Sequence, residues 1–206
     1  RLFDSTGLFD GILIGSGNRA NPLEDAVVNE FYLIKDRNVD TGQGAPAVRY
    51  FDDIIDLTAV DNCVVAGTCT DAQNALYANG WKLTLNQAGG CTSSTCGEKM
   101  LSSPAVFLGR IFFSTFLPGS AGGSCAPSEG TAYSYIISLN DASAIYDLDE
   151  SEEGNERFDE SGTGIPGDPV YISLDGRRYI TPGNLPPGKF RRKLPPIPPI
   201  TYWYRR

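Results

Sequence analysis

Two glycines near the amino end have a spacing that could bind a dinucleotide. Gly15-x-Gly17-x-x-Ala follows the apolar run GILIG, and Asp36 lies nineteen residues beyond Gly17. A glycine-rich turn of this kind brings backbone N–H groups to a pyrophosphate, while the later carboxylate binds a ribose hydroxyl. This chemistry requires a helix that opens within the glycine motif.

The residues after the glycines argue against that helix. Pro22 disfavours helical backbone at Asn21, just where the helix would have to be established. The pattern therefore predicts a tight structural turn built by Gly15, Gly17 and Arg19 that holds no cofactor. A dinucleotide-binding domain remains as an alternative.

Carboxylates could bind calcium in the acidic stretch DASAIYDLDESEEGNERFDE. Asp147, Asp149 and Ser151 fit the first ligand positions of an EF-hand-type loop, but the glycine is two places late. Phe158 then stands where a bidentate Glu belongs. A solvated acidic loop is favoured, and Asp147 and Asp149 are kept as calcium candidates.

Other catalytic groupings are scarce. The chain has no His, so Ser-His-Asp and Cys-His arrangements are excluded. The tightest remaining carboxylate cluster is Asp52, Asp53 and Asp56. Adjacent carboxylates on a strand point to opposite faces, so a surface cluster is favoured over glycosidase chemistry, and we expect no enzyme activity.

Five cysteines lie in polar segments. Cys63 and Cys69 form one close pair and Cys91 and Cys96 another, while Cys125 is left over. Neither pair has the CxxC spacing typical of zinc or redox sites. We predict two local disulfides, Cys63–Cys69 and Cys91–Cys96, in preference to a four-cysteine metal site.

The elements that must position these residues are mostly strands. Short β-branched or aromatic runs bounded by Gly, Pro, Asn or Asp predict strands at 11–15, 31–35, 81–85, 106–114, 132–139, 170–174 and 178–181. Hairpin turns are expected at Leu108-Gly109-Arg110 and Asp175-Gly176. Two short helices are expected, at 21–30 and 70–77. The fold class predicted is all-β with long loops.

Composition limits the partners. An apolar content of 41% and an aromatic content of 11% are typical of a globular chain. The net charge of −8 argues against nucleic acid, and no apolar run is long enough for a transmembrane segment. Because the chain starts at Arg1, we expect a processed product or a fragment.

The carboxyl-terminal residues 183–206 differ from the rest. They are rich in Pro, Lys and Arg and end in Thr201-Tyr202-Trp203-Tyr204-Arg205-Arg206. Although they contain a polyproline ligand motif, a polyproline II strap along a sheet edge is favoured. Residues 1–182 are expected to form the folded domain and 183–206 the strap.

Several segments, in order, resemble the PilC/PilY family of type IV pilus tip proteins. The first is LIGSGNRANPL with VVNEFYLIKDRN. NGWKLTL, GEKMLSSPAVFLGRIFFSTFLP, TAYSYIISLN and the final TYWYRR follow it. The resemblance spans nearly the whole chain and departs from the family at 147–160 and in the two Cys loops.

The resemblance implies the carboxyl-terminal part of a modified β-propeller with quinoprotein-like blades. It implies an exported protein of the outer surface or pilus tip that supports pilus biogenesis, twitching motility and cell adhesion. The partners would be the upstream part of the same protein, minor pilins and a host or surface receptor. The calcium loop of the family lies upstream of the SGNR segment, so no metal ligand is carried over. A quinoprotein-like propeller enzyme is the alternative within this fold.

Overall fold

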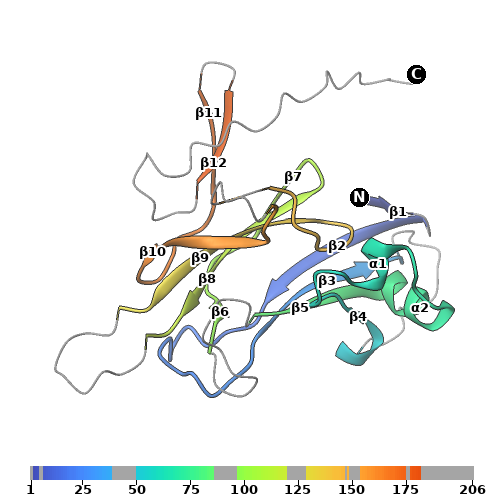
Figure 1. Ribbon diagram of the computed structural model, residues 1–206, viewed down its shortest axis with the longest axis horizontal. Helices are drawn as coiled ribbons and strands as arrows, with labels where there is room; N and C mark the ends of the chain where they lie inside the picture. The colour runs from blue at the N-terminus through green and yellow to red at the C-terminus, as the bar shows by residue number, and fades with distance from the viewer. Residues whose placement is uncertain are drawn as a thin grey trace.

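The described chain is predominantly β-structure, as its strand-like runs predict. The computed structural model describes residues 2–4, 7–38, 50–85, 97–119, 129–146, 148, 154–174 and 177–181. Their strands form two five-stranded sheets and a hairpin, and two short α-helices lie at one end of the first sheet (Figure 1). No helix among these residues is long and apolar enough to cross a membrane.

The first sheet has the strand order β1-β2-β3-β5-β4. Strands β1 (Leu2–Asp4), β2 (Gly7–Gly15), β3 (Glu30–Asp36) and β5 (Gly80–Thr84) form an antiparallel meander. The short β4 (Ile55–Asp56) runs parallel to β5 at the edge. The crossover between β3 and β5 contains β4, the 3-10 helix η1 (Phe51–Asp53), α1 (Cys63–Ala66) and α2 (Asp71–Asn79).

The second sheet is also an antiparallel meander. It comprises β7 (Ala105–Phe107), β8 (Arg110–Leu117), β9 (Thr131–Ser138) and β10 (Phe158–Thr163), and β6 (Lys99–Met100) pairs with β8 beside β7. The edge strand is interrupted between β6 and β7, where the Ser102 hydroxyl bonds both the N–H and the C=O of Ser114 at 3.2 and 2.9 Å. This side chain replaces the ladder hydrogen bonds that the interruption removes.

The core lies between the two sheets. Phe31, Leu33 and Trp81 of the first sheet pack with Phe113 and Tyr135 of the second, and all five are essentially buried. The rings of Phe31 and Phe113 stack with centroids 4.3 Å apart. The Trp81 indole also donates to the carbonyl of Leu139 at 3.0 Å, so aromatic packing and a buried hydrogen bond join the sheets.

The helices of the crossover have clear local causes. Asn62 caps α1 by accepting from two backbone N–H groups, and Gly67 ends it in the left-handed conformation at φ 67°. Helix α2 starts at a capping box formed by Thr70 and Gln73. The helix predicted at 70–77 is therefore confirmed as α2, whereas α1 is an additional turn of helix inside the first cysteine loop.

The predicted helix at 21–30 is wrong. Asn21 N–H donates to the Asn18 carbonyl and Glu24 N–H to the Asn21 carbonyl, which makes successive turns instead of a helix. The hairpin at 108–109 is confirmed, since Leu108 and Gly109 have φ 52° and 73° between β7 and β8. Strands β11 (Val170–Leu174) and β12 (Arg177–Thr181) also pair as predicted; residues 175–176 lie outside the described part.

Candidate functional site

The candidate site is the contact between residues 16–29, here called the β2–β3 loop, and residues 97–101, here called the anchor segment. The two stretches are about eighty residues apart in the chain but lie side by side in the fold. Ser16 is the first link: its N–H donates to the Glu30 carbonyl at 2.8 Å, and its own carbonyl accepts from Met100 N–H at 3.1 Å. The loop therefore joins both sheets at its first residue.

The glycines of the turn allow this close approach. A Cβ atom on Gly15 would lie 2.5 Å from the Cβ of Met100, and one on Gly17 would lie 2.7 Å from the Cβ of Lys99. Across the contact, a Cβ on Gly97 would lie 2.5 Å from the backbone of Asp25. Any larger residue at these positions would push the loop and the anchor segment apart.

Lys99 is the main polar link. Its side chain is buried, and its ammonium group donates to the carbonyls of Pro22 at 2.7 Å and Glu24 at 2.5 Å. Burial lowers the pKa of Lys99, and the charges of Glu24 and Asp25 oppose that shift. A buried cation is retained here because the loop supplies carbonyl oxygens that replace water.

Two further side chains complete the attachment. Asn29 donates from its amide to the Glu98 carbonyl at 2.9 Å, and Arg19 donates from its guanidinium to the Leu101 carbonyl at 3.0 Å. The side chains of Arg19, Asn29 and Lys99 therefore link the β2–β3 loop to residues 98, 99 and 101 of the anchor segment. Gly15, Gly17 and Arg19 all take part in this structural contact.

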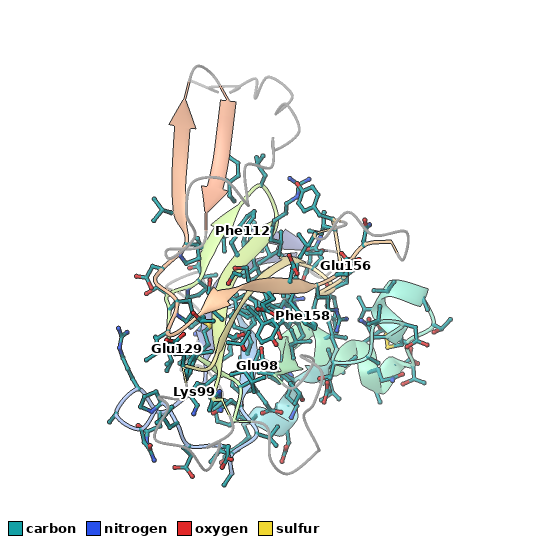
Figure 2. All side chains as sticks on the ribbon, turned by 60° about the vertical axis from the view of Figure 1, so that its left-hand side comes forward. Glu98, Lys99, Phe112, Glu129, Glu156 and Phe158 are labelled. Atoms are coloured by element: carbon teal, nitrogen blue, oxygen red, sulfur yellow. A yellow bond between two sulfur atoms is a disulfide. The ribbon has the colours of Figure 1, made fainter. Side chains whose placement is uncertain are left out.

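Glu98 carries the contact into the core. It is fully buried, and its Oε1 accepts from the hydroxyls of Thr115 at 2.6 Å and Tyr135 at 2.7 Å. Burial, with the charge and hydrogen bond of Glu98, raises the pKa of Tyr135 well above its ordinary value. Figure 2 shows Glu98 and Lys99 as neighbours between the loop and the second sheet.

The fixed loop presents apolar side chains to solvent. Leu23, Val27 and Val28 are 57%, 49% and 37% exposed, and Asp25 lies among them. Exposed aliphatic residues are common on protein surfaces, but these three lie on a loop that hydrogen bonds hold against the anchor segment. We call these three residues the loop patch.

The same geometry argues against a dinucleotide site. Strands β2 and β3 are antiparallel neighbours, with Gly15 opposite Phe31 and Asp10 opposite Asp36. Asp36 is therefore five residues, or about 17 Å, along the strand from the glycines. A fingerprint requires a parallel second strand that brings the carboxylate to the glycine end. Here the anchor segment fills the space beside the glycines.

Other residues predicted from the sequence lie in the crossover between β3 and β5. Cys63 and Cys69 form the predicted disulfide, and Asp53 and Asp56 accept local backbone N–H groups at 2.8 Å. The strand assumed for Asp52 and Asp53 is wrong, because both lie in η1. Within the described residues, no group of three His, Cys, Asp or Glu side chains could hold a metal ion.

Several predictions lie outside the described residues. They are the Cys91–Cys96 disulfide, the unassigned Cys125, the calcium candidates Asp147 and Asp149, and the strap 183–206.

Besides Glu98 and Lys99, two further charged side chains are buried although the sequence alone does not indicate it, because charge does not show burial. Arg157 donates to the carbonyls of Leu57, Thr58 and Ala59 at 2.6 to 3.0 Å, across about a hundred residues of chain. Lys35 is buried and pairs with Asp4 at 3.0 Å. For Lys35 the available signal was its place within the apolar strand EFYLIKD; Arg157 precedes the polar strand β10 and had no such signal.

Comparison with solved structures gives a fold match. The crystal structure of the Pseudomonas aeruginosa PilY1 C-terminal domain superposes with a TM-score of 0.56 over 89% of this chain, at 12% sequence identity. The chain spans 42% of the length of that domain. No protein-family model matches the sequence, and no curated protein matches it.

At this identity the likeness concerns the fold. It agrees with the described architecture of antiparallel sheets packed face to face. The PilY1 domain is more than twice as long as the stretch that this chain matches. The fold match therefore assigns no activity or partner to this chain.

Proposed function

We propose that this chain is part of a modified β-propeller in an exported protein of type IV pili, and that it acts by surface recognition without catalysis. The observation that carries the proposal is the fold match to the PilY1 C-terminal domain over 89% of the chain. The ordered sequence segments that resemble the PilC/PilY family motivate the same proposal, although no family model matches the sequence.

The sheet topology supports the propeller part of the proposal. Strands β1-β2-β3-β5 and β7-β8-β9-β10 are each a four-stranded antiparallel meander. A propeller blade has this same topology, and successive blades pack face to face around the ring. The hairpin β11–β12 would then begin a further blade.

The disulfide supports the proposed location. Cys63–Cys69 staples a short polar loop, and such bonds persist in oxidising compartments outside the cytoplasm. We place the protein on the outer surface of a bacterial cell or at the pilus tip. Its proposed partners are minor pilins and a host or surface receptor, and its proposed roles are pilus biogenesis, adhesion and twitching motility.

The loop patch is the proposed contact surface for a minor pilin. The test replaces Leu23 and Val27 by Asp in the full-length protein and counts surface pili in the native host. Val65→Asp is the matched control, because Val65 is 46% exposed on α1, in the β3–β5 crossover.

We expect gene deletion and the double variant to reduce surface pili and adhesion while pilin synthesis continues, and the control to behave as the wild type. Unchanged piliation and adhesion in the deletion strain would contradict the proposed function. A defect in the deletion strain but not in the double variant would contradict only the proposal that the loop patch contacts a minor pilin.

A further inference from the structure

Lys35 and Asp4 form a buried ion pair in the first sheet. Lys35 is two residues beyond the core residue Leu33 on β3 and is itself buried. Its ammonium lies 3.0 Å from Oδ2 of Asp4, and the two side chains are only 1% and 7% exposed. Burial removes the solvation of both charges, and their mutual attraction offsets this loss only in part. A reaction that removes both charges would therefore be favoured here.

The two residues come from strands that are not neighbours. Asp4 lies on β1 and Lys35 on β3, with β2 between them. The residue of β2 that pairs with Asp4 is Gly7, and the residue that pairs with Lys35 is Gly11. Glycine within a strand allows other groups to approach the backbone closely. The Asp4 and Lys35 side chains can therefore meet across β2.

Two aromatic rings lie against the Lys35 ammonium. Its nitrogen is 3.5 Å from the centroid of the Tyr77 ring and 5.3 Å from that of the buried Phe9 ring. Burial lowers the pKa of Lys35 and the charge of Arg37 acts in the same direction, whereas the hydrogen bond and charge of Asp4 oppose the shift. A lysine amine that is desolvated beside a second cation is an activated nucleophile.

Arg37 holds the carboxyl group that such a nucleophile would attack. Its Nη2 donates to the same Oδ2 of Asp4 at 2.7 Å, and its Nε donates to the carbonyl of Ala78 at 2.7 Å. A guanidinium stays protonated in proteins, so Lys35 is the one of the two cations that can lose a proton. The Arg37 hydrogen bond would also stabilise negative charge on Oδ2 while an amine adds to the carboxyl carbon.

We propose that Lys35 and Asp4 condense to an intramolecular isopeptide bond, an amide between Nζ and Cγ that joins β3 to β1. One C–N bond forms, the bond from Cγ to Oδ1 breaks, and Oδ2 remains as the amide oxygen. Of the three ammonium protons, two leave with Oδ1 as water and one stays on the nitrogen. The step needs no further reactant, oxidant or reductant. The fixed geometry supplies the high effective concentration that condensation in water lacks.

The bond would anchor an edge strand. Strand β1 has three residues and lies at the edge of the first sheet, where it pairs with β2 (Figure 1). An amide between Asp4 and Lys35 spans 31 residues of sequence and attaches β1 to the strand beyond β2. A covalent bond that closes a loop restricts the unfolded chain, so β1 would stay attached when β2 frays. This inference does not depend on the proposed function.

Tryptic digestion with mass spectrometry tests the proposal. The full-length protein is folded in its native host, then denatured, reduced and digested. Trypsin cleaves after unmodified Lys and Arg, so an unlinked chain gives separate peptides 2–19 and 20–35. The amide would block cleavage after Lys35 and join 2–19 to 20–37. We expect this branched peptide, with the summed mass of its two parts less one water.

Lys82 and Glu30 are the matched internal control. Their charged atoms lie 2.8 Å apart, but their side chains are 22% and 23% exposed. Water stabilises these charges, so we expect normal cleavage after Lys82 and no branched product there. Lys35→Arg keeps a cation but removes the primary amine. This variant is expected to give no branched peptide and to unfold at a lower urea concentration than the wild type.

The wild-type digest decides the question even if the variant fails to fold. Complete recovery of the separate peptides 2–19 and 20–35 would overturn the proposal and leave a buried ion pair. A branched product at Lys82 and Glu30 to the same extent would also overturn it, because the linkage would then not depend on burial. The branched peptide of 2–19 and 20–37 in the wild type, with cleavage after Lys82 intact, would establish the bond.

Discussion

Gly15 and Gly17 matter because of the space that their missing side chains leave. The anchor segment approaches so closely that a Cβ on Gly15 would meet the side chain of Met100 at 2.5 Å. The same glycines would suit a pyrophosphate, since both uses require backbone without a side chain. Here the space is filled by another part of the chain.

We therefore expect Gly15→Ala to destabilise the fold by about 1–3 kcal/mol through overpacking. Gly11→Ala on the same strand is the matched control, because its nearest neighbours are the flexible ends of Leu2 and Leu33 at 3.0 and 3.3 Å. Its cost should be smaller. Urea unfolding of both variants measures the difference, and equal losses would contradict the close-approach argument.

The Tyr77 side chain links α2 to Asn140, and its ionisation should make the unfolding free energy sensitive to high pH. Its hydroxyl donates to the Asn140 carbonyl at 3.0 Å. Burial, then the negative charges of Asp4 and Asp141, raise its pKa to about 12 from 10.0. Between these values the unfolded chain releases this proton and the folded chain keeps it, so the contribution of Tyr77 to stability is lost as pH rises.

We expect the unfolding free energy of Tyr77→Phe to fall less steeply than that of the wild type between pH 10 and pH 12. Burial lowers the pKa of Lys35 and Lys99 and acts in the opposite direction, so the difference between wild type and variant is the informative quantity. Unfolding curves at several pH values give it. Parallel pH profiles would contradict the assignment.

At the scale of elements, a disulfide bond stabilises the crossover between β3 and β5. The disulfide Cys63–Cys69 closes a loop around α1, with six residues of sequence separation. Half-buried Cys63, Val64 and Cys69 pack against the core. The bond thus holds an element that is too short to be a stable helix by itself.

We expect the double variant Cys63→Ser with Cys69→Ser to lose about 2 kcal/mol of stability, because the unfolded chain regains the entropy that loop closure removes. A reducing agent should destabilise the wild type similarly and have no further effect on this loop in the variant. Peptide mapping under non-reducing conditions reports the pairing, and two free thiols at these positions would contradict it. The Cys91–Cys96 pairing remains a prediction that the same map tests.

At the scale of the whole molecule, both five-stranded sheets of the described chain have open edges. The outermost strands of the first sheet are β1 and β4, and those of the second are β10 and the interrupted pair β6 and β7. Unpaired groups on such edges favour association with other chains.

We therefore expect residues 1–206 expressed alone to be poorly soluble or oligomeric, and co-expression with the upstream segment to rescue them. Light scattering after size-exclusion chromatography measures the oligomeric state. A stable, monodisperse monomer of 1–206 would contradict this expectation and weaken the case for a partial propeller.

Local sequence is enough to predict most of the longer strands, the hairpin turn at Leu108 and Gly109, helix α2 and the Cys63–Cys69 pair; the single strand predicted at 106–114 is divided by that turn into β7 and β8. These features depend on residues close together in the chain, such as alternating apolar residues, a capping box and turn residues with positive φ. The polar strand β10, FDESGT, has no such local pattern, and only its pairing with β9 makes it a strand.

Which residues form the candidate site depends instead on contacts between distant segments. The helix predicted at 21–30 is replaced by turns because Lys99, from about 75 residues away, binds the carbonyls of the loop. Glu98, Lys99 and Arg157 would be surface residues by their charge, but carbonyls and hydroxyls from distant segments replace their water. Burial of a charge depends on such long-range partners, and local sequence does not specify which distant segments will provide them.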